Sequence, residues 1–196
     1  MSTDPLQPQL AMALGDLTHV PAPIVPPGYA LRHFEPGDEA AWVGLVDEAF
    51  GGPAHAPEWM YERLDDWDFD PARVWFVVQG TQPVATAIAW YRPRWGLTAG
   101  YLHMVAGAKA HRGRGLGAAV SAAALTHLRR EGRDRAVLET DDFRIPAVRA
   151  YLTLGFVPRL IHDNQRARWR TVLAACGRDP EAYAAWLDGP LDPPAD

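Results

Sequence analysis

Residues 111–118 carry the strongest chemical signal in the chain, reading His-Arg-Gly-Arg-Gly-Leu-Gly-Ala. The run follows an apolar, strand-like segment at 101–106 and precedes a helical one at 118–131. Glycines let the backbone approach a ligand closely and adopt angles that other residues resist. The N–H groups at a helix N-terminus carry a partial positive charge, and two arginines add full charges. The pattern therefore predicts a cradle for phosphate groups.

Two common phosphate-binding loops do not fit this run. A Walker loop ends in Gly-Lys-Ser or Gly-Lys-Thr, whereas the chain's only lysine, Lys109, precedes the glycines. A dinucleotide fingerprint needs Gly-x-Gly-x-x-Gly early in a βαβ unit, whereas here the spacing is Gly113-x-Gly115-x-Gly117, past the middle of the chain. What remains, Arg112-x-x-Gly115-x-Gly117, resembles the pyrophosphate-binding motif Gln/Arg-x-x-Gly-x-Gly/Ala of the GCN5-related N-acetyltransferase (GNAT) superfamily.

A later segment resembles the other signature of that superfamily, Asn-x-x-Ala-x-x-x-Tyr-x-x-x-Gly-Phe. Ala147, Tyr151, Gly155 and Phe156 occupy the matching positions, and Arg144 stands where the superfamily has asparagine. This departure removes one side-chain contact expected toward the cofactor. A guanidinium at that position could instead pair with a phosphate.

The resemblance implies acyl transfer from acetyl-coenzyme A to an amine. A neutral amine attacks a thioester directly, so the protein must hold two substrates together, accept a proton from the amine and protonate the departing thiolate. The resemblance places the hydroxyl of Tyr151 beside the sulfur, as general acid; the structural alternative is a packed aromatic on an amphipathic helix. The residues expected to hold the cofactor are Met104, Val105, Gly107, Arg112, Gly113, Arg114, Gly115, Leu116, Gly117, Ala118, Arg144 and Tyr151.

The general base has several candidates. His103 and Tyr101 share one face of the strand before the glycine loop by the period-two rule, and the unperturbed pKa of histidine suits the task. The alternative for His103 is a hydrogen-bonded strand residue. Glu139, at the end of the neighbouring strand, is the second candidate, followed by Asp141 and Asp142.

Other groups of residues favour structural interpretations. Acidic residues gather where the superfamily receives its acceptor and could attract a cationic amine, but a solvated loop is preferred: Glu62, Asp65, Asp66, Asp68 and Asp70. Aromatic residues near the same side are expected to be mostly core, with one or two walling a pocket: Trp59, Trp67, Trp75, Trp90, Tyr91 and Trp95. Arginines on alternate positions of a helical tail predict a solvated face: Arg166, Arg168 and Arg170. The lone Cys176 is interpreted as structural.

Composition excludes several classes of protein. At 196 residues and 48% hydrophobic content the chain suffices for one sizeable core. The net charge of −5 gives no global support to a nucleic-acid partner. A single cysteine excludes an internal disulfide, and the histidines lack metal-ligand spacing, so no metal site is predicted. No signal peptide or membrane-spanning run is evident. We expect a cytoplasmic protein with a small-molecule or peptide amine as acceptor, and a homodimer is one option for its assembly.

The element order β-α-α-β-β-β-α-β-α-β, read over residues 29–161, is that of the acetyltransferase fold. It predicts an α/β (α+β) domain whose central sheet is mixed, mostly antiparallel and flanked by helices on both faces. The strands are expected at 29–34, 74–79, 83–91, 100–106, 135–140 and 156–161, and the helices at 36–50, 58–67, 118–131 and 146–154. Residues 162–196 are expected to form a helical extension of the same domain, with a last helix over 181–187.

Residues 1–28 are rich in proline, yet they are too apolar for a simple linker. Superfamily members usually close the sheet with a hairpin, and no second strand is evident after Ile161. An exposed sheet edge invites association. We therefore expect this N-terminal arm to pack on the core as an extended strand or short turn, in its own chain or in a dimer mate.

Two other functional classes fit the same motifs. The chain could be a catalytically idle module that binds or senses coenzyme A, which a Tyr151 remote from the cofactor would favour. It could also use a larger acyl donor or a non-amine acceptor, depending on the volume beside Gly107 and Trp90.

Overall fold

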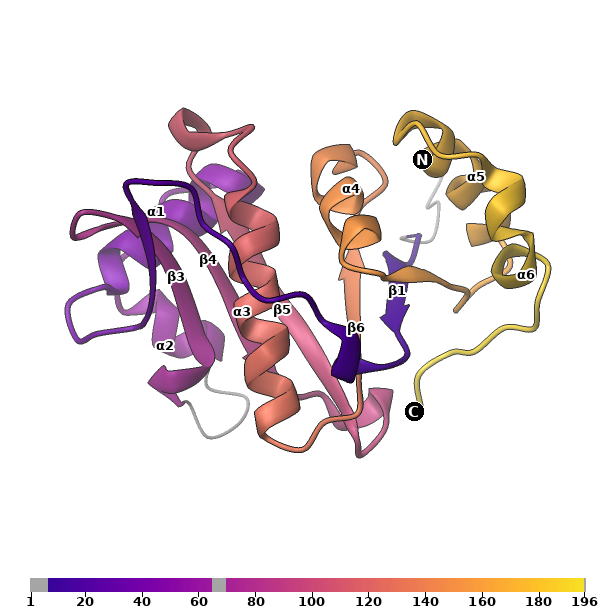
Figure 1. Ribbon diagram of the computed structural model, residues 1–196, viewed down its shortest axis with the longest axis horizontal. Coiled ribbons are helices and arrows are strands. Elements are labelled where there is room, and N and C mark those ends of the chain that lie inside the picture. Colours follow the sequence, from indigo (N-terminus) through magenta and orange to yellow (C-terminus); the bar gives the residue numbers. More distant parts are fainter. Residues whose placement is uncertain (1–6, 65–69, 196) are drawn as a thin grey trace, which may run out of the picture.

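A seven-stranded sheet forms the centre of the protein, in a computed structural model that describes residues 7–64 and 70–195. The strands lie in the order β2-β3-β4-β5-β6-β1-β7 (Figure 1). Neighbouring strands are antiparallel except for β5 and β6, which are parallel. The predicted α/β fold with a mixed, mostly antiparallel sheet is thus confirmed.

Every strand except β1 contains β-branched or aromatic residues, which fit a pleated, half-buried surface, whereas β1 reads Leu-Ala-Met-Ala-Leu. In chain order they are β1 Leu10–Leu14, β2 Tyr29–His33, β3 Val74–Gln79, β4 Gln82–Trp90, β5 Ala99–Gly107, β6 Arg135–Thr140 and β7 Val157–Arg159. Gly80, with a φ of 60°, forms the tight turn of the predicted hairpin between β3 and β4. The strands expected from residue 29 onward are all present, most of them shifted by a residue or two.

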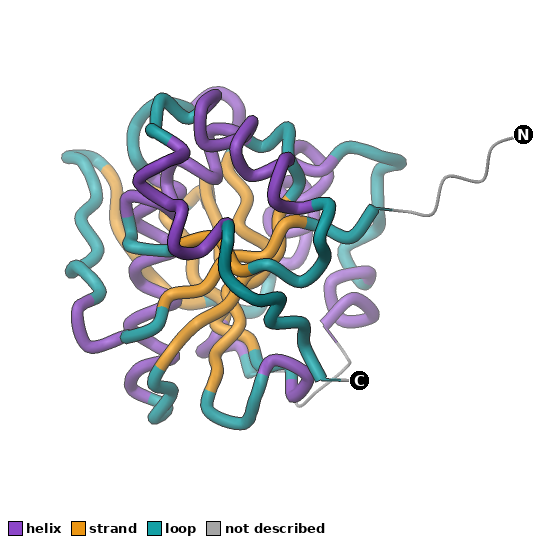
Figure 2. The backbone as a smooth tube through the Cα atoms, turned by 90° about the vertical axis from the view of Figure 1, so that its right-hand side faces the viewer, coloured by secondary structure: helices purple, strands orange, loops and turns teal. Residues whose placement is uncertain are grey.

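The helices cover both faces of the sheet, as Figure 2 shows from the side. They are α1 Glu39–Phe50, α2 Trp59–Leu64, α3 Leu116–Arg130, α4 Ile145–Thr153, α5 Gln165–Ala175 and α6 Ala184–Leu187. Helices α1 and α2 pack on one face, and α3 to α6 pack on the other. We call these the α1 face and the α3 face.

Two helices differ from the prediction. The helix expected over 58–67 is described as far as Leu64, and Asp65, Asp66, Trp67 and Asp68 lie outside the described residues. The helix expected over 181–187 is a 3-10 turn at Pro180–Tyr183 followed by α6. The side chain of Asp179 caps that turn by accepting from the Glu181 N–H at 3.0 Å.

The N-terminal arm enters the sheet as β1, between β6 and β7 of its own chain. Leu10 lies opposite Thr140 of β6, and Met12 lies opposite Pro158 of β7. Leu10 and Met12 are completely buried on the α3 face. Residues 15–28 then cross the outer side of α3 to reach β2 at the opposite edge of the sheet (Figure 1). In the described part of the chain no strand follows β7.

Strands β5 and β6 are paired only at their beginnings. Their pairing extends as far as Tyr101 opposite Val137, after which the two strands separate. Farther along β5 the register with β4 shifts between Thr86 and Ile88, and Met104 of β5 has a φ of 46°. A left-handed conformation at such a bulky residue is uncommon. The bulge bends β5 where it leaves β6, so a gap opens inside the sheet.

Candidate active site

The glycine loop connects the end of β5 to the start of α3. Gly113 and Gly115 have φ values of 77° and 76°, which favour glycine. The first helical hydrogen bond of α3 runs from Ala119 N–H to Gly115 O at 3.0 Å, so the N–H groups before it lack helical partners. A Cβ atom added at Gly113, Gly115 or Gly117 would meet no atom within 4 Å. The loop therefore presents open backbone donors, which fit a pyrophosphate.

Basic side chains of the loop differ in their contacts. Arg112 has no ion pair in the described residues, whereas Arg114 Nη1 donates to Tyr29 Oη at 3.0 Å. Tyr29 Oη also lies 2.9 Å from His111 Nδ1, so β2 anchors the loop on this side. Leu116, expected among the cofactor residues, is 5% exposed, and its side chain belongs to the core. Any contact of Leu116 with a cofactor would therefore come from its backbone.

A cavity of about 320 Å³ occupies the gap between β5 and β6. The separation of the two strands leaves this space open between the helices of both faces. Of the residues expected to hold the cofactor, Met104, Val105, Arg144 and Tyr151 line the cavity, and Gly107 ends β5 beyond it. The other residues lining it are Gln9, Val46, Phe50, Trp59, Arg63, Arg92, Tyr101, Leu102, His103, Glu139, Thr140 and Ala147.

Tyr151 reaches the cavity from α4, on the α3 face. It is 6% exposed and its ring meets that of Phe156 edge-on, with 6.1 Å between the centroids. Burial raises the pKa of the Tyr151 phenol above its ordinary value. The hydroxyl is therefore protonated at neutral pH and can act as a hydrogen-bond donor.

His103 reaches the cavity from β5, on the α1 face. Its ring centroid lies 5.5 Å from that of Tyr101 and 6.1 Å from that of Trp90. Burial lowers the pKa of His103 to about 3, and the positive charges of Arg92 and Arg63 act in the same direction. The sequence-based hypothesis gave His103 an ordinary histidine pKa. This environment corrects that expectation, and the imidazole is neutral throughout the physiological range.

Glu139 also lines the cavity, with its carboxylate held by neighbours. Oε2 accepts hydrogen bonds from Arg94 Nη2 at 2.6 Å, from Tyr101 Oη at 2.8 Å and from Arg92 Nη1 at 3.5 Å. Burial, together with the charge of Glu139, raises the pKa of Tyr101. The structure thus brings two of the predicted base candidates, His103 and Glu139, to one cavity.

The remaining base candidates do not line the cavity. Asp141 Oδ2 accepts from Arg144 Nε at 2.8 Å, and Asp142 accepts two hydrogen bonds from Arg168. The arginines expected on a solvated face each form an ion pair within the domain: Arg166 with Asp163, Arg168 with Asp142, and Arg170 with Glu181 and Asp188. The expectation was wrong for Arg168, whose side chain is only 17% exposed because it reaches Asp142, whereas the pairs of Arg170 lie at the surface.

Arg144 spans the two sides of the gap. Besides Asp141, it contacts the end of α1: its Nη1 donates to Ala49 O at 3.1 Å and its guanidinium lies 4.2 Å from the ring centroid of Phe50. Two of its nitrogens are therefore engaged within the protein. Pairing with a phosphate, as considered from the sequence, would require rearrangement of these contacts.

Sequence patterns missed five polar or aromatic residues that line the cavity: Gln9, Phe50, Arg63, Arg92 and Thr140. None belongs to a motif, and they come from separate elements that only the folded chain brings together. Of the aromatic residues considered as pocket walls, Trp59 is one, whereas Trp90 is buried in the core. The ring of Trp59 stacks on that of His55, with 4.0 Å between the centroids.

Two absences hold for the residues that the structure describes. Among them, no group of three or more His, Cys, Asp or Glu side chains is placed to hold a metal ion. Within 7–64 and 70–195, no helix has the length and apolar character needed to cross a membrane.

Residues 40–156 match the acetyltransferase (GNAT) family. A mycothiol acetyltransferase of Thermobispora bispora is 35% identical over 152 residues, covering 71% of this chain and 50% of that protein. A second mycothiol acetyltransferase, from Parafrankia sp., is 32% identical over 171 residues, covering 76% of this chain and 53% of that protein. The chain spans about half the length of the curated relatives it matches.

Solved structures agree with this match. A GCN5-related N-acetyltransferase from Sphaerobacter thermophilus superimposes with a TM-score of 0.61 at 26% identity, covering 78% of this chain and 50% of that one. A GNAT-family acetyltransferase from Colwellia psychrerythraea shares the fold, with a TM-score of 0.60 at 14% identity, covering 76% of this chain and 53% of that one.

Proposed function

Because this chain belongs to the acetyltransferase (GNAT) family, we propose that it transfers an acetyl group from acetyl-coenzyme A to the amine of a small molecule or peptide. One observation carries the proposal. The open glycine loop and the gap beyond the paired part of β5 and β6 follow the same end of β5, and Tyr151 lines the cavity in that gap.

The acetyl donor, acetyl-coenzyme A, would be held by the glycine loop and by the gap between β5 and β6. The N–H groups before Ala119 and the guanidinium of Arg112 fit the pyrophosphate. Beyond Tyr101, the edge of β5 that faces the gap has no strand partner in residues 7–64 and 70–195, so its backbone groups at Met104 and Val105 can pair with an extended ligand. When bound, acetyl-coenzyme A supplies the thioester whose carbonyl carbon the amine attacks.

Tyr151 is the proposed general acid. Its raised pKa keeps the phenol protonated at neutral pH. A hydroxyl in a buried site can donate to a developing thiolate, and removal of such a donor typically costs two or more orders of magnitude in rate. The buried position on α4 also keeps the hydroxyl away from bulk water.

His103 is the proposed first acceptor of the amine's proton, with Glu139 as the alternative. The neutral imidazole can accept a hydrogen bond, but a pKa of about 3 makes it a transient carrier that passes the proton on. Among the residues that the structure describes, three arginines line the cavity, Arg63, Arg92 and Arg144, and Glu139 is the one carboxylate that does so. This positive surplus favours the uncharged form of an amine, which is the reactive form.

The curated relatives are named mycothiol acetyltransferases, so a mycothiol-related amine belongs among the acceptors to test. The experiment incubates the purified protein with acetyl-coenzyme A and a panel of amines, and follows free thiol release with product mass. Amine-dependent release supports the proposal. Binding of coenzyme A without turnover of any acceptor would identify a binding module, and turnover only with longer acyl-coenzyme A donors would reassign the acyl group.

A further inference from the structure

The N-terminal strand brings a side chain to the cavity. In the pairing of β1 with β6, Leu10 lies opposite Thr140 and Ala11 lies opposite Glu139. Continued by one residue, this register places Gln9 opposite Asp141. Side chains alternate between the faces of a sheet, so Gln9 shares the α1 face with Ala11, and it lines the cavity there.

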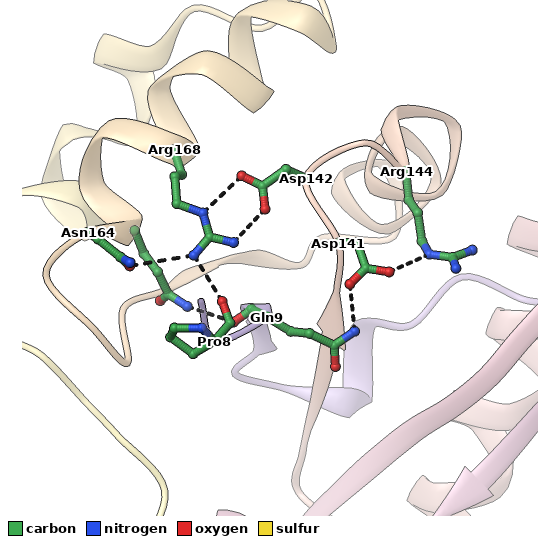
Figure 3. Close-up of polar contacts among 8 residues, drawn as sticks. Pro8, Gln9, Asp141, Asp142, Arg144, Asn164 and Arg168 are labelled. Atoms are coloured by element: carbon green, nitrogen blue, oxygen red, sulfur yellow. Dashed lines mark hydrogen bonds and ion pairs between the residues drawn. The ribbon is translucent and has the colours of Figure 1, made fainter. Parts of the chain in front are cut away.

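Asp141 sets the orientation of the Gln9 amide. Gln9 Nε2 donates to Asp141 Oδ1 at 2.8 Å. Burial alone would raise the pKa of Asp141, but hydrogen bonds from Arg144 and Gln9 and the charge of Arg144 outweigh it and lower the pKa. An ionised carboxylate only accepts hydrogen bonds, so the amide nitrogen must face Asp141. Oε1 therefore points away from Asp141, as Figure 3 shows.

No donor to Gln9 Oε1 occurs among residues 7–64 and 70–195. The amide is nonetheless held in place through its backbone. Gln165 Nε2 donates to the carbonyl of Gln9 at 2.7 Å, and Arg168 Nη1 donates to that of Pro8 at 2.9 Å (Figure 3). Arg168 is itself fixed by two hydrogen bonds to Asp142, of 2.9 and 2.5 Å. Gln9 thus presents an oriented, unused acceptor at the cavity.

We propose that Gln9 is an acceptor-binding residue, whose Oε1 receives a hydrogen bond from an N–H group of the amine substrate. This inference rests on the proposed acetyltransferase function. The placement of Gln9 decides which substrate it contacts. Gln9 lies on the α1 face with Phe50 and Trp59, whereas the glycine loop leads into α3 on the opposite face, where Tyr151 also lies.

The test uses the full chain and steady-state kinetics with acetyl-coenzyme A. The probes are glucosamine, cysteine methyl ester, tyramine and spermidine, and the one turned over fastest is used for the variants. Gln9→Met keeps the length of the side chain and removes the amide. Loss of one neutral hydrogen bond raises the KM for the amine about two- to tenfold, and the KM for acetyl-coenzyme A and the melting temperature are expected to stay unchanged. Gln7→Met, an exposed glutamine of the same arm, is the matched control.

A second variant tests the orienting role of Asp141. Asp141→Asn introduces an amide that can donate as well as accept, so the Gln9 amide is free to turn. The KM for the amine should rise in Asp141→Asn, and Gln9→Met should add no further increase in the double variant.

An unchanged KM for the amine in a folded Gln9→Met protein would overturn the assignment, as would a rise confined to the KM for acetyl-coenzyme A. Absence of turnover by the wild-type protein with all four probes, despite coenzyme A binding, would instead contradict the proposed function itself. The two failures are therefore distinguishable.

Discussion

Leu10 of β1 lies directly opposite Thr140 of β6, so a segment that precedes the matched family region completes the sheet. Strand β1 also pairs with β7, which has no other strand neighbour in the described part of the chain. The apolar sequence of the arm predicts that it covers an exposed sheet edge. The arm instead lies between two strands, and its loss would break the sheet internally.

Deletion of residues 2–20 is therefore expected to destabilise the protein strongly. Leu10, Met12 and Leu17 are completely buried, and burial of each such side chain contributes roughly 1.5–3 kcal/mol. The melting temperature should fall by about 10 °C or more, or the protein should aggregate. Thermal unfolding and size-exclusion chromatography measure this. A truncated protein that stays monomeric and as stable as the full chain would contradict it.

Coenzyme A binding can be tested at Gly117. Its φ is outside the left-handed region and an added Cβ meets no atom within 4 Å, so Gly117→Val fills the open side of the loop without backbone strain. Calorimetry should show loss of most of the affinity for coenzyme A. Gly44→Val is the matched control, because Gly44 in α1 has the same two properties. Equal affinity in the two variants would place the phosphates elsewhere.

Tyr151→Phe should separate packing from chemistry. The ring contact with Phe156 is kept, so the melting temperature should change little, whereas turnover should drop roughly 10²-fold or more if the hydroxyl protonates the leaving thiolate. Stopped assays of thiol release give the rate. Wild-type turnover in the variant would leave Tyr151 as a core aromatic only.

The pH profile should lack a contribution from His103. Its pKa of about 3 means that it stays neutral above pH 5, so a rise of activity with pH reports the acceptor amine. The midpoint of that rise is expected to be the same in His103→Asn as in the wild type, although the rate is lower. Rates measured from pH 5 to 9 check this. A rise that disappears in the variant would mean that bound substrates restore a near-neutral pKa to His103.

Acid should lower the free energy of unfolding partly through the protonation of His103. In the unfolded chain a histidine binds a proton below about pH 6.5, whereas folded His103 does so only near pH 3. The unfolded state thus binds more protons between these values, and the free energy of unfolding falls as the pH drops through that window. Urea unfolding at pH 7.5 and 5 should show a smaller loss for His103→Asn than for the wild type.

The sequence could predict most elements and the two motif-bearing segments because their signals are local. Glycine spacing gave the loop, and helical periodicity placed Tyr151 on a helix. The position of β1 depends on pairing with strands far along the chain, which no local pattern encodes. The low pKa of His103 depends on Arg63 and Arg92, which reach it only after folding. Gln9 was missed for the same reason, since its partner Asp141 belongs to a distant segment.

The position of β1 between β6 and β7 also has a consequence for the order in which the chain acquires its structure. Synthesis produces β1 before every other described element, whereas its partners β6 and β7 are the last strands produced. Closing so long a loop costs conformational entropy before any contact compensates for it, and contacts of high sequence separation slow folding. The apolar side chains of the arm must therefore remain without their native partners until nearly the whole chain has been made, a period in which chaperone protection would matter most.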